Sequence, residues 1–167
     1  MTYSYYLGCV IPTRLPFLEA SVRMTFRSLD IKVRDQENCS CCPDPTGTTL
    51  LDHDSFLALG ARNLCLYEDS KSDVLSLCSG CTETLKTVKH ILDNDNFKKK
   101  EINSILGSIG KKYKGIIGIK HFAQVIYENL EELKSKIKIP LTDLKVAAHP
   151  GCHYLRPSDI IQWDDDW

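Results

Sequence analysis

Short β-prone runs alternate along the chain with longer stretches whose apolar residues recur at helical spacing. The helical spacing predicts helices over residues 16–29, over a stretch with apolar residues between 56 and 64, over 81–92, and over 122–133. The β-prone runs predict strands at 3–9, 31–33, 73–78 and 144–148. This alternation predicts an α/β fold with a mainly parallel sheet flanked by helices.

Local signals support the positions of two of these helices. Pro16 suits the first turn of a helix, where its missing N–H costs nothing. Asp52 or Asp54 could cap the next one. Residues 98–117 are rich in lysine and glycine, and we expect a short helix and a loop there.

Three of the predicted strands end at or just before a cysteine, namely Cys9, Cys78 and Cys152. The carboxyl ends of parallel strands meet at one edge of a sheet, and in open sheets ligands bind at that edge. We therefore expect a cysteine cluster at the C-terminal rim of the strands.

Composition and charge limit the classes of partner that we expect for this chain. The chain has 167 residues, 43% of them hydrophobic and 26% charged, as in an ordinary soluble globular protein. Its net charge of −1 gives no electrostatic case for nucleic acid as a partner. We see no signal peptide and no apolar stretch approaching about 18 residues, so we expect a cytoplasmic protein with no membrane span.

Eight cysteines are the anomaly of the composition, at positions 9, 39, 41, 42, 65, 78, 81 and 152. A secreted disulfide scaffold fits badly, because the chain is long, helix-patterned and rich in ordinary core residues. In a reducing compartment, clustered cysteines indicate metal, iron–sulfur or redox chemistry.

The spacing of five of these cysteines is regular. Between Cys9 and Cys41 lie 31 residues, between Cys42 and Cys78 lie 35, and two more separate Cys78 from Cys81. A disulfide between the neighbours Cys41 and Cys42, in the stretch ENCSCCPDPTG, would have strained geometry. The C-x-x-C pair lies where a strand turns into a helix, and the helix N-terminus favours deprotonated thiols.

The pattern of one cysteine, a Cys-Cys doublet and a C-x-x-C is similar to the cysteine-rich CCG domain found in the B-type subunit of heterodisulfide reductase. The stretches YYLGCVIPTRLPFLEAS and HPGCHYLRPSD also resemble this B-type subunit from methanogenic archaea. The resemblance covers essentially the whole chain. It implies a noncubane [4Fe-4S] cluster held by Cys9, Cys41, Cys42, Cys78 and Cys81.

The number of thiols is consistent with a composite cluster. A cubane cluster or a tetrahedral zinc needs four thiolates and would leave one spare. A composite cluster can use all five, and adjacent cysteines can bind two different irons. Cys39 and Cys65 lie outside the motif; we expect a buried small apolar role for Cys65 and treat Cys39 as a bystander.

The resemblance also implies an oxidoreductase that reduces the CoM-S-S-CoB disulfide in methanogenesis. Its partners would be two other types of heterodisulfide reductase subunit, the ferredoxin-like C type and the A type, which carries flavin and iron–sulfur groups.

Cys152 matches the first cysteine of a second CCG motif, so we expect a first domain over 1–148 and the start of a truncated second one over 149–167. The isolated chain would then be incomplete for turnover. His153 could donate a proton to a departing thiolate.

Three other interpretations remain open. The chain could serve another redox enzyme that uses such domains, of the glycolate oxidase, thiol:fumarate reductase or lactate-utilisation type. It could be a non-catalytic module in which four of the thiolates hold zinc. A metal-free thiol–disulfide oxidoreductase acting through Cys78 and Cys81 would leave the other motif cysteines unexplained.

Overall fold

The computed structural model describes residues 2–140 and 142–163. Within them the chain forms four strands and ten helices. In order, these are β1 (Tyr3–Tyr6), α1 (Val10–Arg14), α2 (Pro16–Ser28), β2 (Val33–Asp35), α3 (Gly47–Leu51), α4 (His53–Ser70), β3 (Asp73–Ser76), α5 (Ser79–Asn94), α6 (Asn96–Gly107), β4 (Ile119–His121), α7 (Phe122–Glu128), α8 (Leu130–Lys136), α9 (Cys152–Leu155) and α10 (Ser158–Ile161).

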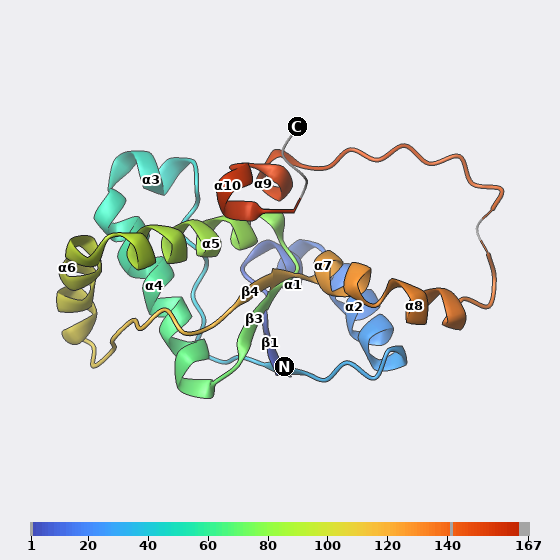
Figure 1. The fold of residues 1–167 in the computed structure, drawn as a ribbon, viewed down its shortest axis with the longest axis horizontal. Helices are drawn as coiled ribbons and strands as arrows, with labels where there is room; N and C mark the ends of the chain where they lie inside the picture. The colour runs from blue at the N-terminus through green and yellow to red at the C-terminus, as the bar shows by residue number, and fades with distance from the viewer. Residues whose placement is uncertain (1, 141, 164–167) are drawn as a thin grey trace.

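The four strands form one parallel sheet in the order β2–β1–β3–β4. Figure 1 shows α4, α5 and α6 on one side of this sheet and α1, α2, α7 and α8 on the other. The predicted α/β class with a parallel sheet flanked by helices is confirmed.

Alternation along β1 divides the interior into two apolar clusters. Tyr3 and Tyr5 belong to the cluster under α2 and α7, whereas Tyr6 belongs to the cluster under α4, α5 and α6. Successive side chains of a strand point to opposite faces, so three tyrosines in a run of four residues can anchor both layers.

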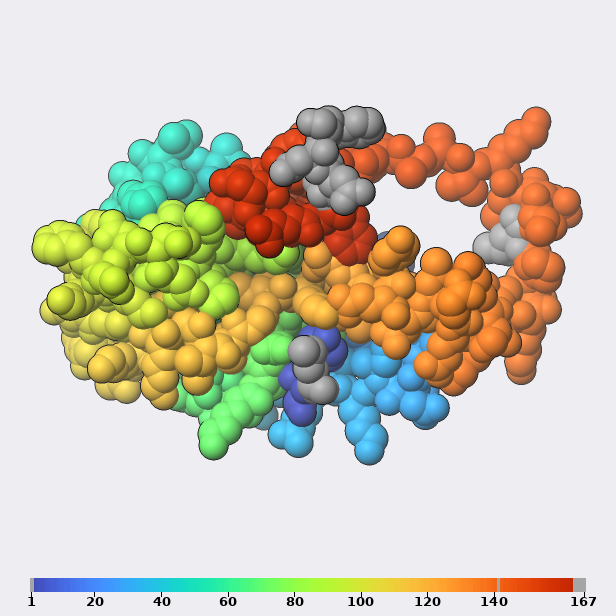
Figure 2. Space-filling model, in the orientation of Figure 1, coloured from blue at the N-terminus to red at the C-terminus, as the bar shows by residue number. Residues whose placement is uncertain are grey.

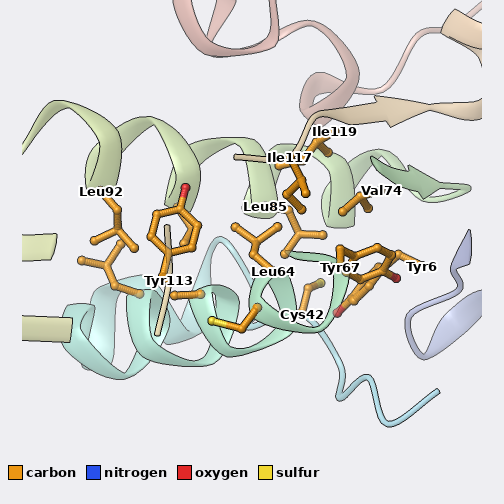
Figure 3. Packing of buried hydrophobic residues seen from close by; sticks show 14 of the residues in the cluster. Tyr6, Cys42, Leu64, Tyr67, Val74, Leu85, Leu92, Tyr113, Ile117 and Ile119 are labelled. Carbon is orange, nitrogen blue, oxygen red and sulfur yellow. The ribbon is translucent and has the colours of Figure 1, made fainter. Parts of the chain in front are cut away.

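The larger cluster lies between α4 and α5. In Figure 3 these helices face each other, with Tyr6 and Tyr67 at one end of the cluster and Leu92 and Tyr113 at the other. Gly60 of α4 lies so close to α5 that a Cβ on it would be 2.6 Å from Val88. The absence of a side chain at Gly60 therefore sets how closely the two helices approach.

The predicted helix starts agree with the structure. α2 begins at Pro16, and the Asp52 side chain caps α4 by accepting from the backbone N–H groups of Asp54 and Ser55. The helix expected over 122–133 is instead two helices, α7 and α8, because Asn129 between them leaves helical geometry.

The strand predicted at 144–148 is wrong. That segment has no regular structure, and Leu144 and Val146 are 60% and 81% exposed. The fourth strand is Ile119–His121, just after the stretch expected to be a helix and a loop, and it pairs with β3. A β-prone run becomes a strand only where a neighbour completes its backbone hydrogen bonds, and 144–148 runs away from the body of the molecule (Figure 2).

After this excursion the chain returns to the body. α9 and α10 pack against α5 (Figure 1), and Lys86 Nζ donates to the Ile161 carbonyl at 2.6 Å. Among the described residues, none of the helices has both the length and the apolar character needed to cross a lipid bilayer.

Candidate metal centre

Two of the predicted cysteines follow the two central strands of the sheet. From β1 the chain crosses to β2 at one edge of the sheet, and from β3 it crosses to β4 at the other. Cys9 follows the end of β1 and Cys78 follows the end of β3. Neighbouring parallel strands whose connections leave in opposite directions open a crevice at their carboxyl ends, where ligands of such folds bind.

The loop after β2 brings the doublet to the same place. Cys41 is exposed and Cys42 is buried, and their thiols contact different partners. Cys41 Sγ lies 3.3 Å from Cys9 Sγ, whereas Cys42 Sγ lies 3.2 Å from Cys81 Sγ. The two neighbouring thiols therefore point to different parts of the site.

Cys78 and Cys81 form the third contact, at the N-terminus of α5. The hydrogen bond from the Cys81 thiol, assisted by the backbone N–H groups of Cys81 and Gly80, lowers the pKa of Cys78 to about 6. Hydrogen bonding between the Cys42 and Cys81 thiols also lowers the pKa of Cys42 and raises that of Cys81. Two thiols of the site are thus prepared to be thiolates, the form that binds metals.

Gly8 lies against the Cys81 thiol of the site. Its φ of +64° lies in the left-handed region, and a Cβ there would be 2.9 Å from Cys81 Sγ. Any side chain at this position would strain the backbone and push against a motif thiol.

The five thiols meet in two groups, Cys9 with Cys41, and Cys42 with Cys81 and Cys78. Within 2–140 and 142–163, no three or more His, Cys, Asp or Glu side chains are arranged so that they could hold a single metal ion. Five soft thiol donors exceed the four that one zinc takes and suit a group with several metal atoms.

Cys65 and Cys39, two of the three cysteines outside the motif, make other contacts. Cys65, on α4, is 1% exposed within the larger apolar cluster, as expected, and burial raises its pKa to about 11. Cys39 lies with its sulfur 3.5 Å from the Tyr67 hydroxyl, which itself donates to the Tyr5 carbonyl.

The C-terminal residues reach the edge of the site. Cys152 is the first residue of α9 and is exposed, but it does not follow a strand as predicted. His153 Nδ1 lies 3.4 Å from a carboxylate oxygen of Glu83, and this imidazole contributes to lowering the pKa of Cys78. His149 lies in the exposed segment before α9.

The sequence did not single out Asn63 or Tyr6, which both bind the backbone of the doublet loop. Asn63 lies in α4 among Ala61, Leu64 and other buried positions. A polar residue on the apolar face of a predicted helix was the signal that could have identified it.

Comparison with known proteins places this chain in a family. Residues 3–86 match the profile of the cysteine-rich domain CCG. The B-type subunit of the ferredoxin/F420H2-dependent CoB–CoM heterodisulfide reductase of Methanosarcina acetivorans is 39% identical over 157 residues, which cover 93% of this chain and 52% of the relative. The 8-methylmenaquinol:fumarate reductase membrane anchor subunit of Wolinella succinogenes is 37% identical over 162 residues, covering 97% and 56%.

A solved structure shares the fold. The crystal structure of a hypothetical protein from Helicobacter pylori superposes with a TM-score of 0.66 at 18% identity, over 76% of this chain and 25% of that one.

The chain spans about half the length of the two sequence relatives. The profile match nevertheless includes all five motif cysteines and three of the four strands, among them the two that Cys9 and Cys78 follow. The chain belongs to the CCG cysteine-rich domain family.

Proposed function

We propose that this chain is an iron–sulfur subunit, or half-subunit, of a heterodisulfide reductase. Cys9, Cys41, Cys42, Cys78 and Cys81 would hold a noncubane [4Fe-4S] cluster. When bound, such a cluster supplies electrons one at a time to a disulfide such as CoM-S-S-CoB. The similarity to the Methanosarcina subunit over 93% of the chain supports this assignment.

The observation that carries the proposal is the divergence of the doublet. Cys41 Sγ contacts Cys9 Sγ, and Cys42 Sγ contacts Cys81 Sγ. Adjacent residues that turn their thiols to separate partners suit ligands to different irons of one composite cluster. A single zinc would need four thiols around one point.

His153 is the candidate proton donor. An imidazole titrates near neutral pH and can protonate a thiolate that leaves a broken disulfide. Glu83, whose side chain is 13% exposed, lies beside His153 Nδ1 and could orient the ring. This leaves Nε2 as the nitrogen that could face a substrate.

The catalytic unit would contain a second cysteine set. Cys152 would begin a second CCG motif, which divides the chain into a first domain over 1–148 and the start of another over 149–167. The eight cysteines of the sequence supply one complete five-cysteine set. We therefore propose that turnover needs a second set, and that electrons arrive from partner subunits of the A and C types in the cytoplasm.

A second candidate function is favoured by one comparison. The relative from Wolinella succinogenes, named as a fumarate reductase membrane anchor subunit, is about as similar as the methanogen subunit. The same cluster could then exchange electrons with a quinol-linked fumarate reductase. The rates with CoM-S-S-CoB and with a quinol analogue, measured on the assembled complex, distinguish the two.

Anaerobic purification of the chain tests the cluster itself. We expect brown protein with about four irons and four sulfides per chain after reconstitution. Cys42→Ser should lose most of this iron, whereas Cys65→Ser, which changes a buried thiol outside the site, should retain it. Colourless protein with one zinc per chain, or equal iron in both variants, would contradict the proposal.

A further inference from the structure

We propose that Asn63 is a positioning residue that, together with the Tyr6 hydroxyl, holds the Cys41–Cys42 backbone so that the two thiols diverge. This inference rests on the proposed function, since it explains how the cluster ligands acquire their directions. It concerns a part of α4 that contains no proposed ligand.

The amide oxygen of Asn63 binds the residue before the doublet. Asn63 Oδ1 accepts from the Ser40 backbone N at 3.0 Å and from Ser40 Oγ at 3.1 Å. Arg62 Nη1 donates to the same oxygen at 3.1 Å and also donates to the Asn38 carbonyl at 2.6 Å. The start of the loop is therefore fixed to α4.

The amide nitrogen of Asn63 binds the doublet itself. Asn63 Nδ2 donates to the Cys41 carbonyl at 3.4 Å and to the Ser40 carbonyl at 3.5 Å. It also lies 3.2 Å from the Tyr6 hydroxyl, which donates to the Ser40 carbonyl at 2.8 Å. The Cys41 carbonyl belongs to the peptide group that joins the two cysteines, so fixing this group orients both side chains.

The location of Asn63 makes these contacts specific. Its side chain is fully buried on α4, where an unbonded amide would be costly. Its hydrogen bonds go to the doublet loop, to Tyr6 and to Arg62, and Arg62 itself binds the loop. Residues 39–44 have no regular secondary structure of their own. Their conformation therefore depends on such side-chain contacts.

Another asparagine provides a matched control. Asn103 on α6 holds the backbone of Tyr113 in the same manner: its Oδ1 accepts from the Tyr113 N at 2.7 Å and its Nδ2 donates to the Tyr113 carbonyl at 3.0 Å. The segment that Asn103 fixes carries no cysteine. Asn103→Leu therefore reproduces the loss of a backbone clamp without affecting the doublet.

The first experiment measures thiol accessibility in the metal-free chain. In the wild type, Cys42 is 8% exposed and should react slowly with iodoacetamide, as followed by peptide mass spectrometry. We expect Asn63→Leu to accelerate Cys42 alkylation about tenfold. The rate at Cys65, on the same helix, should not change, and Asn103→Leu should leave Cys42 at the wild-type rate.

The second experiment measures the electronic signature of the reconstituted cluster. We expect Asn63→Leu to shift the EPR g-values or to lower the iron content, and Asn103→Leu to do neither. If Asn63→Leu does not fold, Tyr6→Phe removes only one hydroxyl and should give a smaller change in the same direction.

Unchanged Cys42 alkylation in both Asn63→Leu and Tyr6→Phe would overturn the inference. Equal acceleration of Cys42 alkylation in Asn63→Leu and Asn103→Leu would also overturn it, because this would reflect a general loss of rigidity. If the wild-type chain binds no iron, the proposed function fails, yet the alkylation rates still decide whether Asn63 positions the doublet.

Discussion

Cys41 and Cys42 show how far two neighbouring residues of one type can differ. One thiol is exposed and contacts Cys9, and the other is buried and contacts Cys81. Their separation along the chain is the smallest possible, so the difference in environment comes from the loop conformation and not from the sequence spacing. The roles of all five thiols as cluster ligands remain predictions.

Gly8 offers a test at the same scale. Gly8→Ala should cost about 1 kcal/mol of unfolding free energy through its positive φ, and it should also displace Cys81 Sγ. Gly110 has a similar φ of +68°, but no atom within 4 Å of its Cβ position, so Gly110→Ala carries the strain alone. Urea unfolding and iron content measure the two effects.

We expect both alanine variants to lose stability and only Gly8→Ala to lose iron. Equal iron content in Gly8→Ala and the wild type would show that Cys81 tolerates displacement, or that it is not a ligand.

Among the secondary-structure elements, the packing of α4 on α5 connects the core to the site. α4 carries Asn63 and α5 begins at the C-x-x-C, so the distance between these helices sets the distance between the doublet loop and Cys81. Gly60 lies against Val88 across this contact.

Gly60→Ala should separate these helices. The new methyl group would lie 2.6 Å from a Val88 methyl, and such overpacking costs roughly 1 to 3 kcal/mol. Adding Val88→Ala makes room for this methyl group. The double variant should therefore lose less unfolding free energy than the two single variants lose together. Urea unfolding of the four proteins gives the coupling energy, and simple additivity would show that the helices adjust without strain.

For the whole molecule, His121 makes stability depend on pH. It is 7% exposed, its Nδ1 accepts from the Ala123 backbone N–H at the start of α7, and burial lowers its pKa to about 4. The folded chain keeps this ring neutral, whereas the unfolded chain protonates it below about pH 6.5. Stability contributed by the neutral ring is therefore lost as the pH falls from about 6.5 toward 4.

We expect this group to remove about 2 kcal/mol of unfolding free energy between pH 7 and pH 5. His121→Asn retains a helix-capping side chain but does not titrate in this range. We measure the unfolding free energy of both proteins with urea at both pH values. Between pH 7 and pH 5, that of His121→Asn should fall by about 2 kcal/mol less than that of the wild type. Parallel pH profiles for the two proteins would refute the assignment to His121.

Much of this molecule was predictable from contiguous residues. The α/β alternation, the starts of α2 and α4, the burial of Cys65 and the positions of Cys9 and Cys78 after strands all follow from local periodicity and capping chemistry. Each of these features depends on a few neighbouring residues, so the order of residues along the chain is enough to specify it.

Which distant residues meet depends on the folded chain. The strand order made Ile119–His121 the fourth strand in place of 144–148, because only the former lies beside β3 with its backbone paired. Asn63 binds the backbone of the doublet loop because the fold places α4 beside that loop. Cys41 and Cys42 acquired different partners for the same reason: hydrogen bonds and sulfur contacts depend on separations in space, which no spacing along the chain specifies.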